Sequence, residues 1–348
     1  MLRLLGQWIA GMCLFLIIAE IVFRILPVST STEVGYHIDD LILTYPPHHH
    51  FIAATGWNLE NVQRHRSNNF GFLSKIEFKP DPTAVALIGD SFVEASMLSE
   101  SERLSTRLSD GLKNRAVYAF GGPGSSLLDY AERIRLAHQR FGIREFIVVL
   151  ELGDIKQSLC GSGNNHGPCL APATLTLTTT HPAATSVAKR YLRHSALAQY
   201  LFSQLKLAPA RLLPALVESS KPVLPITKLP AIHAYVSPGE VSAIVSDAVH
   251  RAFFARIAPF PIARLIFVLD SDRQALNSGA TPSTDTRRRF KAAAQHRGAE
   301  VIDLAETFEA ALAATGLRLE ISPRDAHWNP AAVTLIAQQV LALFNATP

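Results

Sequence analysis

The sequence predicts an α/β fold in which a mostly parallel sheet is covered by helices on both faces. From residue 84 onward, short apolar runs rich in Val, Ile and Phe alternate with longer stretches of helical periodicity. Continuous apolar runs separated by amphipathic helices are typical of parallel strands that are buried on both faces. The predicted strands are residues 84–88, 116–120, 146–150, 265–269 and 301–304, and the predicted helices are residues 101–113, 125–140, 285–296 and 331–344.

The composition supports a folded domain with a sizeable core. Of the 348 residues, 48% are hydrophobic and 18% are charged, which excludes a disordered chain. The net charge of +4 is small, and the densest basic run, Arg287 to Arg289 with Lys291, falls on a predicted helix. We interpret this run as a solvated face, so no nucleic-acid partner is expected.

An apolar stretch at residues 4–26 is long enough to span a membrane. Its charges, Glu20 and Arg24, stand four residues apart and can neutralise each other on one helical face. No Lys or Arg follows Arg24 until Arg64, which predicts that the rest of the chain lies outside the cytoplasm. A cleaved signal peptide is the alternative. Because no small-x-small cleavage site follows, we expect a single-pass anchor in the cytoplasmic membrane with the main domain in the periplasm.

Composition divides the chain into a membrane anchor at residues 1–30, an extended lead-in at residues 31–80 and the α/β domain at residues 81–348. Inside that domain, residues 155–262 show no clear strand and include a Thr/Ala/Pro-rich loop at residues 171–182. The helices predicted within this segment are residues 187–206 and 241–254. We interpret the segment as an insertion between the third and fourth strands. Such insertions often shape the rim of a site, although a stabilising flap is an equal alternative.

Three cysteines are present, and Cys13 lies in the membrane stretch. Cys160 and Cys169 bracket a loop rich in Gly and Asn, and in an oxidising compartment they should pair, with a stabilisation of about 2–3 kcal/mol. A metal site that includes His166 is the alternative, but few other ligands lie nearby. The three histidines at residues 48–50 have no second cluster and are interpreted as a solvated loop, so no metal is predicted.

A serine follows the first predicted strand directly, in the segment Gly89-Asp90-Ser91. This places Ser91 at the carboxyl edge of the sheet, where such folds bind ligands and where backbone N–H groups at a helix start are free. Those N–H groups can stabilise an oxyanion in acyl transfer. A serine helix cap is the structural alternative.

A carboxylate and an imidazole lie two residues apart near the end of the chain, at Asp325 and His327. Asn329 and Pro330 are a good N-cap and first residue for the last helix, so His327 is predicted on the loop that enters it. Asp325 can orient the imidazole and stabilise its charged form. A structural Asp–His cap is the alternative, and Trp328 is interpreted as a packing residue.

A glycine-rich turn at residues 121–126 follows the second predicted strand and precedes a helix. Phosphate binding at the helix start is one interpretation. The turn lacks the Gly-x-x-x-x-Gly-Lys spacing of a nucleotide-binding loop, which argues against it.

With these segments in their observed order, residues 64–345 resemble the SGNH (GDSL-type) hydrolases, specifically a membrane-anchored bacterial branch that ends in Asp-x-His-Trp-Asn. The resemblance implies a flavodoxin-like, three-layer α/β/α domain and serine esterase or acyltransferase chemistry without a cofactor. It implies Ser91 as nucleophile, His327 as general acid/base and Asp325 as its orienting carboxylate. Asp90 is then a support of the turn.

The resemblance also implies an oxyanion hole that contains the backbone amides of Ser91 and Gly124. Many members add an Asn side chain just after the third strand, but here Gly153 fills that place within Glu151-Leu152-Gly153-Asp154. The third donor is therefore missing unless Asn164 or Asn165 supplies it.

The predicted function is hydrolysis or transfer of an O-acyl group on a cell-envelope or exported glycan, or on another small ester. Its partners would then be an acylated carbohydrate, the membrane and the machinery of an envelope polysaccharide. A weakened glycan-binding or assembly subunit that keeps the fold is the alternative, and a lipid esterase is a third.

Overall fold

The structure, a computed structural model, describes residues 1–113, 115–162, 167–181, 186–205, 207, 241–278, 285–323 and 325–346. It divides into two compact units. The smaller unit comprises Met1–Thr32, His50–His65 and Ala183–Ala234, and the larger comprises Glu33–His49, Arg66–Pro182 and Tyr235–Pro348.

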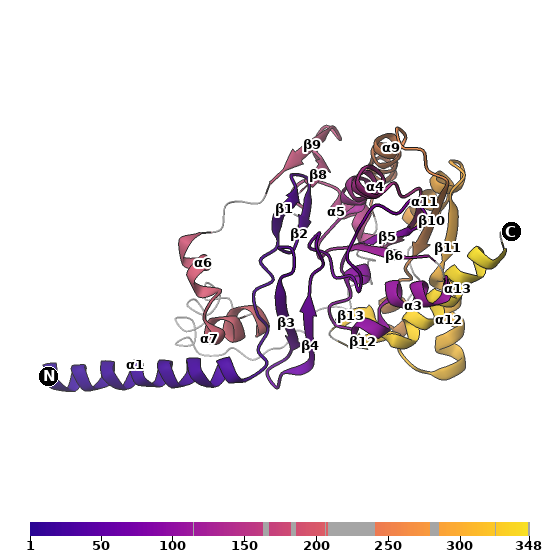
Figure 1. Cartoon of the computed structure of the whole chain (residues 1–348). Helices are drawn as coiled ribbons and strands as arrows, with labels where there is room; N and C mark the ends of the chain where they lie inside the picture. Colours follow the sequence, from indigo (N-terminus) through magenta and orange to yellow (C-terminus); the bar gives the residue numbers. More distant parts are fainter. Residues whose placement is uncertain are drawn as a thin grey trace, which may run out of the picture. The chain divides into compact units, whose positions relative to one another are not determined.

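A five-stranded sheet forms the centre of the larger unit (Figure 1), and all its neighbouring strands are parallel. Its strands are β5 (Val85–Gly89), β6 (Val117–Gly121), β7 (Glu145–Leu150), β10 (Arg264–Leu269) and β11 (Glu300–Asp303). They lie in the order β11-β10-β7-β5-β6, so the first strand of the sheet lies between the second and the third. This is the flavodoxin-like order, and it confirms the predicted fold class.

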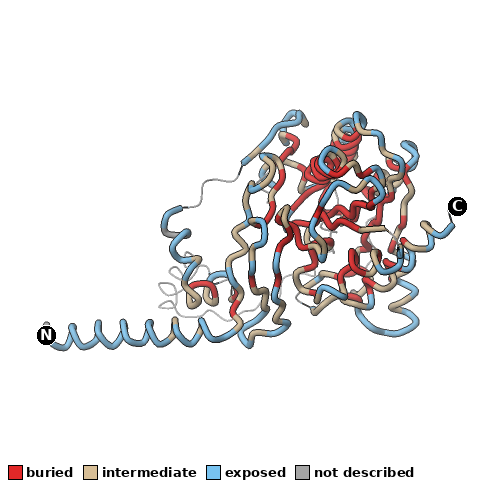
Figure 2. The backbone as a smooth tube through the Cα atoms, in the orientation of Figure 1, coloured by how far each residue is buried: buried red, intermediate tan, exposed pale blue. Residues whose placement is uncertain are grey.

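Alternate side chains of each strand enter two different cores, as the pleat of a strand requires. In β5, Ala86 and Ile88 face the core under one layer of helices, and Val85 and Leu87 face the core under the other. The first layer contains α4 (Leu127–Phe141), α9 (Ala243–Ile257) and α11 (Asp285–Gln295), and the second contains α3 (Leu104–Gly111), α12 (Leu304–Thr315) and α13 (Pro330–Ala346). Figure 2 shows the sheet as largely buried, and every residue of β5 and β6 is buried.

The short elements at the sheet edges complete the larger unit. They are β1 (Gly35–Asp39), β2 (Ile42–Thr44), α2 (Ser91–Glu94), η1 (Glu100–Glu102), α5 (Gly153–Gln157), β8 (Gly167–Leu170), β9 (Leu177–Thr180), α10 (Arg273–Ser278), β12 (Glu320–Ser322) and β13 (Asp325–Trp328). Within the predicted lead-in, the Asn68 carboxamide accepts hydrogen bonds from the amides of Phe70 and Phe72. Phe72 is buried in the core, so this segment packs against the domain.

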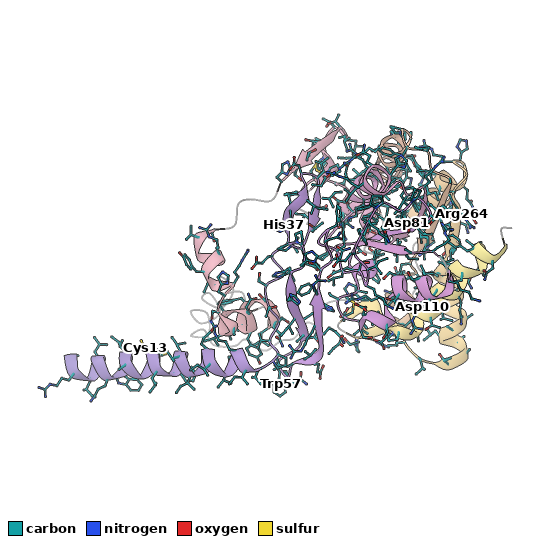
Figure 3. All side chains as sticks on the ribbon, viewed as in Figure 1. Cys13, His37, Trp57, Asp81, Asp110 and Arg264 are labelled. Carbon is teal, nitrogen blue, oxygen red and sulfur yellow. A yellow bond between two sulfur atoms is a disulfide. The ribbon has the colours of Figure 1, made fainter. Side chains whose placement is uncertain are left out.

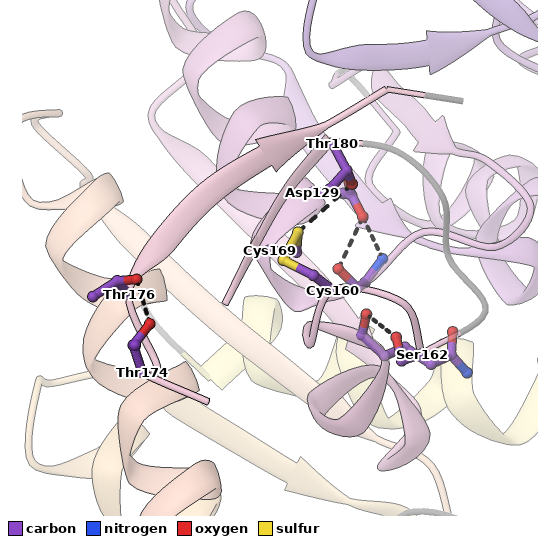
Figure 4. Close-up of a disulfide and its surroundings, with 9 residues drawn as sticks. Asp129, Cys160, Ser162, Cys169, Thr174, Thr176 and Thr180 are labelled. Carbon is purple, nitrogen blue, oxygen red and sulfur yellow. Dashed lines mark hydrogen bonds between the residues drawn. A yellow bond between two sulfur atoms is a disulfide. The ribbon is translucent and has the colours of Figure 1, made fainter. Parts of the chain in front are cut away.

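Within residues 155–262, where no clear apolar strand was predicted, the loop predicted at residues 171–182 was partly wrong. β8 and β9 form an antiparallel hairpin there, with Gly167 opposite Thr180. The hairpin was missed because β9 is a Thr-rich strand with exposed side chains, and it therefore carries no apolar run. The predicted Cys160–Cys169 disulfide is present and links β8 to residue 160 (Figure 4), with the Cys169 Sγ 3.6 Å from Thr180 Oγ1.

Two other sequence predictions needed correction. The helix predicted at residues 187–206 is three shorter pieces: α6 (Val187–Leu192), α7 (Ala196–Ala198) and the π-helical η2 (Gln199–Gln204). Arg287 does not belong to a solvated face, because its guanidinium is buried against the Asp303 carboxylate and the Asp270 carbonyl. The chain turns Arg287 inward because α11 packs over the end of β10 and β11.

The smaller unit contains α1 (Leu2–Ile25) and the hairpin of β3 (His50–Thr55) and β4 (Glu60–Arg66). Residues Arg3–Ile25 form a helix long and apolar enough to cross a membrane, with a mean hydropathy of 2.1. Cys13 lies exposed on this helix with a free thiol (Figure 3).

Candidate active site

Ser91 is the first residue of α2, which starts where β5 ends. The Asp90 carboxylate accepts a hydrogen bond from the Phe92 amide at 2.9 Å and so caps this short helix. The end of β6 lies against α2: a Cβ on Gly121 would be 2.2 Å from the Glu94 nitrogen, which leaves room only for glycine. Ser91 therefore stands at the carboxyl edge, beside the strand where the sheet order reverses, where open α/β sheets bind ligands.

The structure brings Ser91, His327 and Asp325 together. The Ser91 Oγ is 2.8 Å from His327 Nε2, and the His327 Nδ1 is 2.5 Å from Asp325 Oδ1. The predicted entry loop is in fact β13, which pairs with β12 in an antiparallel ribbon. A strand holds the alternate residues Asp325 and His327 on one side, so the carboxylate can orient the imidazole. The arrangement can move a proton from the serine to the imidazole, whose charge the carboxylate stabilises.

Three residues that the sequence analysis missed hold His327 in place. The Phe92 ring lies 4.8 Å from the imidazole, centroid to centroid. The Arg273 guanidinium donates hydrogen bonds to the Asp270 carboxylate and to the Ala326 carbonyl next to His327. Asp270 directly follows the fourth strand of the sheet, just as Asp90 follows the first, and that shared placement was the available signal.

Trp328 is a packing residue, as predicted. Only 2% of it is exposed, and its indole N–H donates to Asp270 Oδ1 at 2.9 Å. The Asn329 carboxamide accepts from the Ala332 amide at 3.0 Å, which confirms the predicted N-cap of the last helix. The C-terminal end of the strand that carries His327 is therefore attached to firmly packed elements.

The carboxyl ends of β5 and β6 are tied together by Arg133, a buried residue of α4. Its guanidinium donates to the carbonyls of Gly89 and Phe120 and to the Ser125 hydroxyl. Burial lowers the pKa of Arg133, whereas the nearby Asp129 raises it. The first turn of α4 is closed by reciprocal bonds between Ser126 and Asp129, which argues against phosphate binding there.

Two amides at this edge are available for an oxyanion. Among the described residues, the N–H groups of Ser91 and Gly124 donate to no protein acceptor. Gly124 is exposed and has a positive φ of 67°, a conformation that favours glycine. Their role in an oxyanion hole stays a prediction, and the suggested donors Asn164 and Asn165 lie outside the described residues, as does His166.

The Gly153 position, where the third donor is expected, is occupied differently. The Gly153 amide donates to Glu151 Oε2 at 2.7 Å. A Cβ built on Gly153 would lie only 2.2 Å from that same oxygen. The space next to Gly153 therefore holds the carboxyl group of Glu151.

Buried carboxyl groups gather at this edge of the sheet. Burial raises the pKa of Asp90, of Asp270 and of Asp154, whose Oδ2 accepts from the Tyr130 hydroxyl at 2.8 Å. Burial, together with the charges of Asp270 and Asp90, raises the pKa of Glu151 to about 7. With a pKa of about 7, Glu151 is therefore partly protonated near neutral pH.

No metal centre is evident in the part of the chain that the structure describes, where no three His, Cys, Asp or Glu side chains gather to hold an ion. Of the three consecutive histidines, His48 contacts the Arg66 guanidinium at 2.7 Å and the Glu77 carboxylate at 3.6 Å.

No protein-family model and no curated protein sequence matches the chain. Solved structures similar to it include a member of the lipolytic protein G-D-S-L family from Veillonella parvula, with 12% identity over 76% of this chain and 98% of that one and a TM-score of 0.41. A carbohydrate acetylesterase family member from Sinorhizobium meliloti has 12% identity, coverage of 76% and 97%, and a TM-score of 0.33. A lipase/acylhydrolase from Enterococcus faecalis has 10% identity, coverage of 75% and 94%, and a TM-score of 0.37. At these values the likeness assigns no activity, and the fold class is established by the strand order.

Proposed function

We propose that this protein is a serine esterase or O-acyltransferase of the SGNH type. The observation that carries the proposal is the continuous hydrogen-bonded chain from Ser91 through His327 to Asp325 at the carboxyl edge of the sheet. A nucleophile, a base and an orienting acid in that order are what serine acyl transfer requires. The structural alternatives, a serine cap and an Asp–His cap, do not account for the 2.8 Å contact between Ser91 and His327.

In the proposed reaction, the His327 Nε2 takes the proton of Ser91 while the serine oxygen bonds to the acyl carbon. The carbonyl oxygen becomes an oxyanion that accepts hydrogen bonds from the amides of Ser91 and Gly124. The C–O bond to the leaving alcohol then breaks, and His327 returns the proton to that alcohol. A water or a sugar hydroxyl next attacks the acylated Ser91, again with His327 as base, and Asp325 remains ionised throughout.

The proposed substrate is an O-acyl group on a cell-envelope or exported glycan. The resemblance to the membrane-anchored branch supports this class, and the disulfide fits an oxidising compartment. An envelope-polysaccharide assembly is then the expected setting.

We propose that α1 is a retained anchor in the cytoplasmic membrane, with the α/β domain in the periplasm. The Glu20 carboxylate of α1 accepts hydrogen bonds from the Ser195 hydroxyl and from the amides of Ala196 and Leu197, at 2.7 to 3.0 Å. A signal peptide is removed and would leave these groups without their acceptor. Mass spectrometry of the membrane-extracted protein should therefore find residues 1–26, and their absence would contradict a retained anchor.

A fluorophosphonate probe tests the enzyme proposal most directly, because it labels an activated serine. The parent should be labelled at Ser91, Ser91→Ala should not be labelled, and a matched change at the exposed Ser101 (Ser101→Ala) should leave labelling unchanged. Gly153 lacks the side-chain donor of many relatives, which favours a second candidate, a glycan-binding or assembly subunit. Glycan binding without labelling or turnover would favour that candidate.

A further inference from the structure

The end of β7 lies beside the candidate nucleophile. In the parallel pairing of β5 with β7, Ile88 is opposite Val148, so Ser91 at the start of α2 and Glu151, which directly follows β7, lie at the same edge of the sheet. On the other side of β7, Leu150 is opposite Leu269 of β10. Glu151 and Asp270 are the next residues of these two strands, so they are neighbours at the same edge of the sheet. The acyl group on Ser91 and the side chain of Glu151 therefore share one edge of the sheet.

The Glu151 carboxyl occupies the space that a side chain at residue 153 would need. Its Oε2 accepts the Gly153 amide at 2.7 Å and lies 2.2 Å from an ideal Cβ there. The other oxygen, Oε1, has no hydrogen-bond partner among the described residues, and Glu151, although largely buried, keeps part of its surface exposed. One oxygen thus fixes the carboxyl group to the start of α5, and the other can meet a ligand.

We propose that Glu151, in its neutral form, donates a hydrogen bond from Oε1 to the oxyanion formed at Ser91. The inference rests on the proposed esterase function. The carboxyl group of Glu151 would then be the third donor of the oxyanion hole. It would take the place of the Asn side chain that many members of the resembled family carry where this chain has Gly153. The bond strengthens as negative charge develops on the substrate oxygen, which is the condition for a catalytic contribution.

The groups around Glu151 favour its neutral form. Burial has the largest effect, and Asp270 at the end of β10 and Asp90 at the end of β5 add to it, so that the pKa rises to about 7. Asp154 of α5 is a further carboxyl group that interacts with Glu151 as a like charge. The hydrogen bond from the Gly153 amide and the charge of Arg273 of α10 instead lower the pKa of Glu151. A carboxyl group that its surroundings keep protonated can serve as an oxyanion donor. An ionised Glu151 would instead repel the oxyanion.

The test is the pH dependence of kcat for p-nitrophenyl acetate in four variants of the full-length protein. In the parent, kcat should fall as pH rises through about 7, because Glu151 loses the proton that it donates. Glu151→Gln carries a permanent N–H donor, so it should stay within tenfold of the parent at pH 6 and keep its rate at pH 9. Glu151→Ala should lower kcat by about 10²–10³ with little change in KM. The matched control is Glu145→Gln, at the other end of β7, which should leave the profile unchanged.

The double variant Glu151→Gly with Gly153→Asn moves the donor to the position that relatives use. It removes the oxygen that blocks a side chain at residue 153, so kcat should recover to within tenfold of the parent. The decrease of kcat at alkaline pH should then disappear. Circular dichroism must show that each variant is folded.

The inference is overturned if Glu151→Ala stays within threefold of the parent, or if Glu151→Gln keeps the alkaline fall, while Ser91→Ala is inactive. If Ser91→Ala keeps its activity or Ser91 is not labelled, the proposed esterase itself fails.

Discussion

The His327 Nε2 lies 2.8 Å from the Ser91 Oγ, although 236 positions separate the two residues in the sequence. Ser91 is held by the end of β5 and by the Asp90 cap, and His327 is held by a ribbon strand next to the last helix. Because both are attached to packed elements, the fold fixes their separation, as the proposed proton transfer requires.

Ser91→Ala should abolish hydrolysis of small acyl esters and leave the fold intact. The substitution removes one oxygen at a half-buried position, so the free energy of unfolding should fall by no more than about 1 kcal/mol. Ester hydrolysis and thermal unfolding of the same preparation check the two parts. Residual hydrolysis within tenfold of the parent would mean that another nucleophile acts.

Arg273→Met should lower both stability and turnover. The guanidinium is 7% exposed and pairs with Asp270, whose carboxylate is 3% exposed, so the change leaves a buried charge without its partner. Breaking such a pair typically costs about 3–5 kcal/mol. Turnover should fall with it, since the Arg273 bond to the Ala326 carbonyl also positions His327.

The double variant Arg273→Met with Asp270→Asn is the control for this ion pair. It removes both charges and should regain part of the lost unfolding free energy in denaturant titrations. Equal stability of the two variants would show that Asp270 is not the group left unpaired.

Gly153→Asn alone should destabilise the protein and reduce its activity. The new Cβ would lie 2.2 Å from Glu151 Oε2, far inside contact distance, so Glu151 must move and release the Gly153 amide. From the sequence alone, an added Asn would be expected to raise turnover by restoring a donor. A tenfold rise in kcat from the single substitution would support that simpler expectation and contradict the steric one.

Glu151→Gln should flatten the dependence of stability on pH. The pKa of Glu151 is raised from 4.5 to about 7 on folding, so the native state holds the proton more strongly than the unfolded chain. Its contribution to stability is therefore complete below pH 4.5 and is lost as pH rises through 7. Melting temperatures should show the variant gaining on the parent between pH 4.5 and pH 8. Parallel curves would mean that Glu151 titrates as it does in the unfolded chain.

The central strands could be predicted because a strand that is buried on both faces appears in the sequence as a continuous run of apolar residues. All the residues of β5 are buried, and a run of such residues between turns can be recognised without knowledge of the fold. The β8–β9 hairpin could not, because Thr178 and Thr179 carry exposed polar side chains, and their strand conformation depends on pairing across the hairpin. Arg287 was misassigned for a similar reason: its polarity predicts solvent, but its partners Asp303 and the Asp270 carbonyl lie on other elements.

The sequence by itself determined the five sheet strands and the apolar N-terminal helix, because apolar periodicity and turn residues act over a few neighbouring positions. The choice of Ser91, Asp325 and His327 as candidates came from their two motifs and from the family resemblance that those motifs carry. Only the tertiary structure decided that these three side chains form one hydrogen-bonded chain, that Arg273 and Asp270 support it, and that Glu151 fills the space beside Gly153. Those contacts join the ends of different strands. Their distances depend on how the whole sheet packs, and no local pattern of residues records that.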